Sequence, residues 1–465
     1  MNAPTLWIIV PFFFGLLLLS ITNQRVLSLL GGSLAVALAV IAQIVPIELA
    51  MNLGSFSFKI DSSLTVLGRV LLIQPSEGSL LALIYGAAAL WFFGAEASQR
   101  ATRIVPLGFM IIALMVASIA VEPFLYAALF IETAILLAIP MLTSIYHSPG
   151  RGIVRFLIYQ TLAMPFILLA GWLLAGVEAS PGDLALAAQS GAMLGLGFAF
   201  LLAIFPLYNW MPLLLEDTSP YTVGFLLWIV PTMTIVFGAG FLDRYSWLRN
   251  SQQLILALRF AGLLMVVTGG AFAAFQRHLG RIMAYGSITE TGFSLLALSL
   301  DLRLGIPILF LLVPARALGL AVWSLSLTII KDNVETMRFG AAQGILRVTP
   351  LAGAGMIAAT LSAGAFPLLA GFPARLALWE GLSRVSLGSA LWMAVGIIGL
   401  LISAFRSLAV ISMAEEYTSW QPRESPTQMT MLGLGMIGLF FLGLFPQTVQ
   451  FILADLPLMF EHLGR

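Results

Sequence analysis

The sequence predicts an all-α polytopic membrane protein with about 14 transmembrane helices. Of its 465 residues, 60% are hydrophobic and only 9% are charged, whereas a soluble domain usually carries about 25% charged residues. The mean hydropathy is +1.02. Charge-free runs recur along the chain, as between Asp183 and Glu216 or between Glu424 and Asp455. A bilayer core about 30 Å thick requires about 20 apolar helical residues, so each such run is long enough to cross it.

Charge and composition exclude several function classes. The 22 basic and 21 acidic residues give a net charge of +1, and nucleic-acid binding needs a concentrated basic face. Cysteine is absent, which excludes disulfides, iron–sulfur clusters and a thiol nucleophile. The three histidines, His147, His278 and His462, are far apart in sequence. We therefore expect no metal, no cofactor and no nucleic-acid partner.

Fourteen membrane spans are expected. They lie near 6–21, 26–46, 78–95, 104–121, 123–145, 153–175, 190–211, 220–241, 254–276, 281–300, 304–329, 349–371, 388–412 and 428–452. The first is taken as a helix because it lacks the basic start and cleavage site of a signal peptide. Residues 52–73 alternate and then turn amphipathic, which predicts a short hairpin and an interfacial helix. The longest polar links, 331–348 and 413–427, leave no room for a soluble nucleotide or flavin domain.

The basic residues predict an orientation. With fourteen spans, eleven lysines and arginines of the loops fall on one side and seven on the other. Cytoplasmic loops are the more basic ones, so we expect both termini to be extracytoplasmic. The protein is expected in a prokaryotic plasma membrane.

Several charged residues lie in apolar surroundings: Glu132, Glu290, Arg316 and Arg406 lie inside expected spans, and Arg375 follows the apolar stretch AGAFPLLAGFP. A charge at mid-bilayer costs roughly 3 kcal/mol or more, so each should face protein or a hydrated cavity. One interpretation is a polar path for a proton or ion, which Glu132 favours because it lies deep in its span. The other is structural ion pairing or snorkelling to an interface, which Arg406 favours because it lies near a span end.

Two pairs of prolines predict broken helices. Pro206 and Pro212 belong to the seventh span, and Pro367 and Pro373 belong to the twelfth. Proline removes a backbone donor, and broken spans occur where they border a cavity or are buried in protein. The breaks are five spans apart, which predicts two inverted five-helix repeats and favours a transporter. The expected units are 1–103, 104–245, 250–415 and 426–465.

The sequence resembles the antiporter-like membrane subunits of respiratory complex I, of Mrp-type sodium/proton antiporters and of membrane-bound hydrogenases. The similar stretches are GSFSFKIDSSL, LFIETAILLAIP, FPLYNWMPLLLEDTSPYTVGFLLWIVP, AAFQRHLGRIMAYGSITETGF and AGFPAR. The resemblance implies fourteen helices, two inverted repeats and broken helices 7 and 12. It places Glu132 on the family's helix 5 glutamate and Arg375 on its helix 12 lysine or glutamate.

The sequence also departs from that family. The family's buried lysines fall on Leu201, Met233 and Gly280, and the only two lysines are Lys59 and Lys331, both expected outside the membrane core. A route of alternating buried lysines and glutamates therefore does not carry over intact. It stays open whether transport survives that loss.

These observations lead to three hypotheses. The first is a proton- or cation-translocating subunit of a complex-I-like or Mrp-like assembly, coupled to redox chemistry in partner subunits. In it Glu132 and Glu290 titrate, and Arg316 and Arg375 are fixed positive charges. The second is a transport-silent scaffold paralogue, and the third is a stand-alone secondary transporter. No residue set could carry electrons, so an oxidoreductase label would belong to the whole complex.

Overall fold

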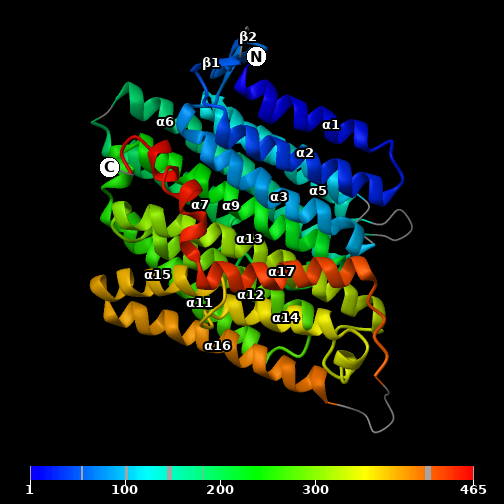
Figure 1. Cartoon of the computed structure of the whole chain (residues 1–465). Coiled ribbons are helices and arrows are strands. Elements are labelled where there is room, and N and C mark those ends of the chain that lie inside the picture. The colour runs from blue at the N-terminus through cyan, green and yellow to red at the C-terminus, as the bar shows by residue number, and fades with distance from the viewer. Residues whose placement is uncertain are drawn as a thin grey trace.

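The structure is a computed structural model that describes residues 2–53, 56–99, 103–143, 149–180, 182–413 and 420–463. Helices dominate it, and they run roughly side by side (Figure 1). The N-terminal helices are α1 (Val10–Leu18), preceded by a π-helical turn at Thr5–Ile9, α2 (Gln24–Ile44) and α3 (Gly78–Ser98). The next group is α4 (Ile104–Ala120), α5 (Ala127–Leu142), α6 (Arg151–Ala179), α7 (Leu184–Leu201), α8 (Trp210–Asp217) and α9 (Pro220–Arg244).

The second half of the chain continues in the same way. Its helices are α10 (Ser246–Arg249), α11 (Gln252–Phe275), α12 (Leu279–Leu298), α13 (Leu302–Asn333), α14 (Pro350–Ala363), α15 (Gly371–Val385) and α16 (Leu387–Ser412). The chain ends with α17 (Pro426–Leu444) and α18 (Gln450–Leu453). The fourteenth expected span thus ends as a helix at Leu444, and 3₁₀ turns at Pro446–Val449 and Leu456–Met459 follow.

Nine helices of the described residues are long and apolar enough to cross a membrane. Four shorter apolar helices accompany them: Thr5–Leu18, Ile104–Ala120, Ala185–Leu201 and Pro350–Ala363. Large apolar side chains also face outward, such as Trp172, Phe260 and Phe275. An exterior this apolar suits hydrocarbon rather than water.

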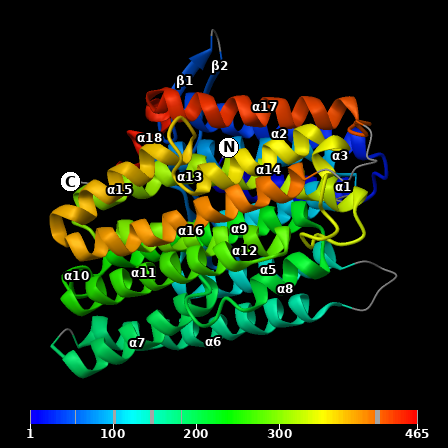
Figure 2. The same cartoon turned by 90° about the horizontal axis from the view of Figure 1, so that it is seen from below.

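Among these nine helices, the most buried are α3, α9 and α13, which lie at the centre of the bundle in Figures 1 and 2. Trp91 of α3 packs on Tyr221 and Trp228 of α9, and the Tyr221 hydroxyl donates to the Trp91 carbonyl at 2.8 Å. Gly94 permits this approach, because a Cβ there would lie 2.2 Å from the Tyr221 hydroxyl. Figure 2 shows α6 and α7 on one side of this centre and α17 on the opposite side.

The segment expected at 52–73 has the predicted hairpin structure but no interfacial helix in its described residues. Strand β1 (Ala50–Leu53) pairs with β2 (Phe56–Lys59), and β3 (Ser63–Val66) pairs with β4 (Arg69–Leu72). Strand β5 (Val121–Glu122) extends the second sheet beside β4. The turn between β3 and β4 has positive φ at Leu67 and Gly68, which is the backbone of a tight hairpin turn. In this segment, the alternating pattern of side chains therefore predicted the structure correctly, and the amphipathic helical pattern did not.

Helices α7 and α14, which precede the two predicted breaks, end with the same backbone turn. After α7, Ala203 has a φ of +51°, and the Ile204 amide donates five residues back to the Ala199 carbonyl at 2.9 Å. After α14, Ala365 has a φ of +53°, and Phe366 donates to the Leu361 carbonyl at 3.0 Å. A residue with positive φ closing the last helical turn is a Schellman-type ending. An alanine rather than glycine in this conformation stores backbone strain.

Candidate functional site

Glu132 lies on α5 and is only partly buried. The Thr161 hydroxyl of α6 donates to its Oε1 at 2.9 Å. Among the described residues, no basic side chain forms an ion pair with Glu132 within 4.0 Å. In the described structure, the Glu132 carboxylate therefore accepts a hydrogen bond from a hydroxyl and has no cation as its partner.

Gln160, the neighbour of Thr161, reaches the end of the broken helix α7. Its Nε2 donates to the Phe200 and Leu201 carbonyls, each at 3.4 Å. Gln160 is 1% exposed, and its Oε1 is buried with no hydrogen-bond partner in the described part of the chain. An amide side chain thus satisfies helix-end carbonyls that a broken helix leaves open.

Glu290 lies on α12 and forms an ion pair with Arg375 of α15, whose Nη2 donates to Glu290 Oε1. The two residues are 6% and 2% exposed, so the pair is sequestered from solvent. Arg375 also lies over the Phe293 ring, 5.0 Å from its centroid. A buried carboxylate needs such a partner because an isolated buried charge is far more costly.

Arg316 of α13 brings a second positive charge to α12. Its Nη2 donates to the Thr291 hydroxyl at 3.0 Å and to the Leu227 carbonyl of α9 at 2.9 Å. Arg316 is 3% exposed and interacts electrostatically with Glu290. The structure therefore brings Glu290, Arg316 and Arg375 together from three helices, whereas Glu132 stands apart from them on α5.

The break before α15 positions Arg375. The Gly371 amide, at the start of α15, donates to Ser362 Oγ of α14 at 3.0 Å. A Cβ at Gly371 would lie 1.9 Å from Arg375 Nη1 and 2.0 Å from the Ser362 carbonyl oxygen. A glycine is thus required where the second half of the broken helix begins.

The four prolines at the breaks divide into two kinds. Pro206 and Pro367 lie in the non-helical segments after α7 and α14, whereas Pro212 and Pro373 are each the third residue of the helix that follows, α8 and α15. Proline is tolerated in a first helical turn because its missing N–H has no helical acceptor there. One proline of each pair therefore lies in the break, and the other begins the next helix.

The contacts of Arg406 indicate a structural role at the end of α11. Its Nη1 donates to the Ala274 carbonyl in the last turn of α11, and its guanidinium lies 5.7 Å from the Phe339 ring centroid. A cation at a helix C-terminus satisfies open carbonyls and complements the helix dipole.

A polar cluster joins α8, α12 and α13 at one end of the bundle. Glu216 Oε1 lies 2.6 Å from Arg281 Nε, and Lys331 Nζ donates to the Thr218 carbonyl at 2.7 Å. His278, in the turn between α11 and α12, caps α12 by accepting the Arg281 amide at 3.3 Å. The pKa of His278 is lowered to about 4, chiefly by burial and also by nearby cations, while Glu216 opposes the shift. Histidine is thus neutral at physiological pH here.

Sequence reasoning missed four polar groups: Gln160, Thr161, Thr291 and Ser362. Gln160, Thr161 and Ser362 interrupt apolar runs, and Thr291 directly follows Glu290; these are the signals that could have found them. Across the described ranges, no group of three His, Cys, Asp or Glu could hold a metal ion.

Comparisons with known proteins agree on a family. A family model described as "NADH:quinone oxidoreductase/Mrp antiporter, TM" matches residues 183–403. The chain is 28% identical over 285 residues to NAD(P)H-quinone oxidoreductase chain 4 1 of a Synechococcus species, covering 57% of this chain. The chain is thus similar to the antiporter-like membrane subunits of complex I and Mrp complexes, over a segment just short of half its length in the family model. The alignment spans only 53% of that relative's own length.

Solved structures share the fold over the whole chain. A chain of respiratory complex I from Thermus thermophilus superposes with a TM-score of 0.79 at 18% identity, covering 99% of this chain and 100% of that one. A chain of the Mrp complex from Dietzia superposes with a TM-score of 0.80 at 15% identity, covering 99% and 97%. This chain is therefore a helical polytopic membrane protein with the antiporter-like fold. Glu290, Arg316 and Arg375 fall inside the matched family segment, whereas Glu132 precedes it.

Proposed function

We propose that this chain is a proton- or cation-translocating membrane subunit of a complex-I-like or Mrp-like assembly. Its partners would be other membrane subunits, and redox chemistry in other subunits would drive it. The observation that carries the proposal is the buried Glu290–Arg375 pair, because Arg375 lies in the helix that follows a break. An ion pair placed beside a broken helix can open when that helix moves, and its carboxylate can then exchange a proton.

The proposed architecture has fourteen spans. It adds α12 and the four shorter apolar helices to the nine long ones, with α7–α8 and α14–α15 each counted as one broken span. Residues 104–245 and 250–415 would form two inverted five-helix repeats, flanked by 1–103 and 426–465. The matching turns after α7 and α14 support the repeat, since both close on an alanine with positive φ.

The proposed proton route begins at Glu132 and ends at Glu290. Glu132 is partly exposed and can exchange a proton through the Thr161 hydroxyl. At the second carboxylate, Arg316 Nε, Arg375 Nε and Arg375 Nη1 are buried without a hydrogen-bond partner in the described residues. Such donors carry a cost of about 1–3 kcal/mol each unless something accepts from them, so the site suits transient water. Arginine stays charged, so it would bias the carboxylate rather than relay the proton.

The second candidate is a transport-silent scaffold of such an assembly. It is favoured by the apolar environment at Leu201 and Met233, each 1% exposed, and by the absence of a cation at Glu132 among the described ion pairs. A scaffold would have the same partner subunits as the translocating subunit proposed above, but it would not move ions.

The proposed orientation places both termini outside the cell in a prokaryotic plasma membrane. The termini lie at one end of the bundle, because Ala3 pairs with Asp61, and the turn at Leu456–Met459 packs on the turn that precedes α3. Since the sequence has no cysteine, single cysteines at Thr65 and Glu335 can report sidedness. An impermeant maleimide should label the first in intact cells and the second only after lysis. The reverse pattern contradicts the orientation.

Glu132→Gln tests the transport function. The variant should assemble normally and lose coupled proton uptake, measured with a pH-sensitive dye in proteoliposomes that contain the whole assembly. Glu335→Gln is the matched control, because Glu335 is an exposed loop carboxylate beyond α13. Unchanged uptake in Glu132→Gln removes Glu132 from the mechanism, and an assembly that never takes up protons favours the scaffold.

A further inference from the structure

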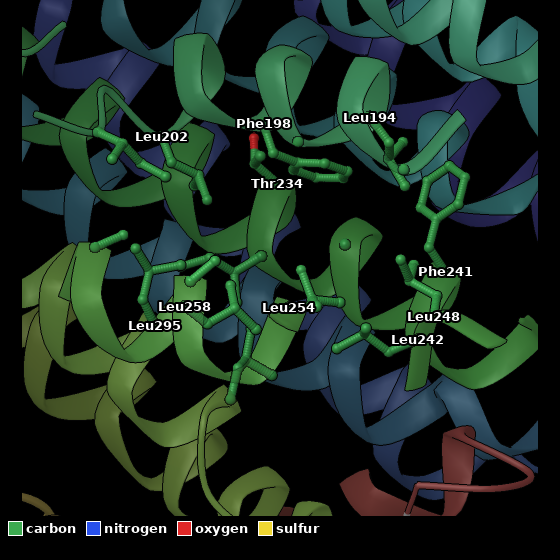
Figure 3. A pocket seen from close by; sticks show the side chains of 18 residues that line it. Leu194, Phe198, Leu202, Thr234, Phe241, Leu242, Leu248, Leu254, Leu258 and Leu295 are labelled. Atoms are coloured by element: carbon green, nitrogen blue, oxygen red, sulfur yellow. The ribbon is translucent and has the colours of Figure 1, made fainter. Parts of the chain in front are cut away.

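An apolar cavity of about 200 Å³ lies between the first and the second half of the chain. Helices α7 and α9 contribute Leu194, Phe198 and Phe241, and helices α11 and α12 contribute Leu258 and Leu295. Figure 3 shows these side chains facing one another across an open space. A comparable apolar void of about 150 Å³ in a soluble protein stays dry and takes up benzene. The space therefore suits hydrocarbon.

This cavity is unsuited to an ion path. Thr234 supplies the one hydroxyl among its lining residues, and no lining residue is charged. The Thr234 Oγ1 is buried and has no hydrogen-bond partner in the described structure. A water chain needs two to four polar partners at each site. The cavity is thus chemically distinct from the route through Glu132 and Glu290.

The cavity opens toward the surface that would face the membrane. Gly195 of α7 and Ala257 of α11 line it and are exposed. Both helices are apolar, and α11 is long enough to cross a bilayer. A hydrocarbon chain can therefore enter from the bilayer without crossing any polar layer.

Two arginines lie at the end of the cavity nearest the chain termini. Arg249 Nη1 donates to the Leu242 carbonyl at 3.3 Å and to the Asp243 carbonyl at 2.7 Å, at the end of α9. Arg259 Nη2 donates to the Ser299 carbonyl at 2.9 Å, directly after α12. Leu242 and Leu298, the neighbour of Ser299, both line the cavity.

Neither arginine is neutralised by a carboxylate within 4.0 Å among the residues that the structure describes. The Nε of Arg259 is buried and lacks a hydrogen-bond partner. Arg259 is seven residues inside α11, about 10 Å from its end, where a long side chain can reach the headgroup region. An uncompensated guanidinium there favours an anion, and phosphate is an acceptor that matches its geometry.

We propose that the cavity holds part of one acyl chain of an anionic phospholipid whose phosphate is bound at Arg249 and Arg259. The hydrocarbon chain fills the space between the two halves, and the headgroup neutralises the two cations at their end. The lipid would couple the packing of α7 and α9 to that of α11 and α12.

Photo-crosslinking tests this site. The assembly is reconstituted in vesicles of equal phosphatidylcholine and phosphatidylglycerol, with a diazirine on the acyl chain of one lipid or the other. The phosphatidylglycerol probe should label α7 and α11 peptides. Gly195→Leu should reduce that labelling severalfold, because no atom lies within 4 Å of the position of a Cβ at Gly195 and the larger side chain fills the cavity. Gly433→Leu is the matched control, since Gly433 has equal space in α17 away from the cavity.

A second set of variants tests whether the lipid phosphate is bound at Arg249 and Arg259. Arg249→Gln combined with Arg259→Gln should reduce the preference for phosphatidylglycerol by roughly 30-fold, as expected for two arginine–phosphate contacts near a membrane surface. Thr234→Val should leave labelling unchanged, because an acyl chain needs no hydrogen-bond donor. Equal labelling in the wild type and Gly195→Leu overturns the proposal. Loss of labelling in Thr234→Val overturns it too, because the ligand would then be held by a polar group.

Discussion

Glu132 and Glu290, the two carboxylates of the proposed proton route, have opposite surroundings. Glu132 is partly exposed and accepts one hydrogen bond from a threonine, whereas Glu290 is sequestered with Arg375 and has Arg316 nearby. Full burial requires charge compensation, but a partly exposed carboxylate can remain without a cation. The difference teaches that the second region compensates its buried carboxylate with arginines, while the first region depends on hydroxyl and amide groups.

Arg375→Met should have the largest effect on this comparison. It leaves Glu290 buried without its partner, which costs about 3–5 kcal/mol, and it should lower the thermal unfolding temperature of the assembly and abolish proton uptake. The double variant Glu290→Gln/Arg375→Met should recover most of the stability but none of the uptake. If the single variant is as stable as the wild type, the ion pair is not the element that holds this region.

Gly371→Ala should impair the second region while every charge stays in place. The added methyl group collides with Arg375 Nη1 and the Ser362 carbonyl, and overpacking of this kind costs about 1–3 kcal/mol. Proton uptake should fall, as measured in proteoliposomes. Gly433→Ala in α17 is the control because no atom lies within 4 Å of its Cβ position. Equal uptake in both variants would mean that the position of Arg375 does not matter.

Thr161→Val tests the first region. It removes the hydrogen bond to Glu132 without changing charge or size, which should cost about 1 kcal/mol. Proton uptake by proteoliposomes should slow, because the carboxylate loses the hydrogen bond that the Thr161 hydroxyl donates to it. Thr161→Ser should restore the wild-type rate. An unchanged rate in Thr161→Val would remove the hydroxyl from the proposed route.

His278→Asn should have the smallest effect, seen only in the pH dependence of stability. His278 is a base whose folded pKa, about 4, lies below its usual value of 6.5. The unfolded chain therefore binds more protons between these values, and stability falls as pH drops through that window. Asparagine can still cap α12 but does not titrate. The unfolding temperature of the variant should thus decline less between pH 6.5 and 4, and an identical decline would contradict the lowered pKa.

The sequence predicted the long helices well because their apolar runs are set by bilayer thickness, and it located the interruptions near Pro206 and Pro367. It also selected Glu290, Arg316 and Arg375 from their cost in hydrocarbon. It could not predict that Arg375 pairs with Glu290, because 85 residues separate them and only the packing of α12 on α15 brings them together. The hairpin expected at 52–73 is confirmed, but the interfacial helix expected there is wrong, because strand alternation and an amphipathic helical pattern overlap in short stretches.

Only a measurement of ion transport tests the roles predicted for Glu132, Glu290, Arg316 and Arg375. Redox-driven proton uptake by proteoliposomes that contain the assembly, with Glu290→Gln beside the wild type and the Glu335→Gln control, tests them most directly. The account predicts an assembled Glu290→Gln complex with no proton uptake and a control with full uptake. Full uptake in Glu290→Gln would contradict the central claim that a proton passes through this buried carboxylate.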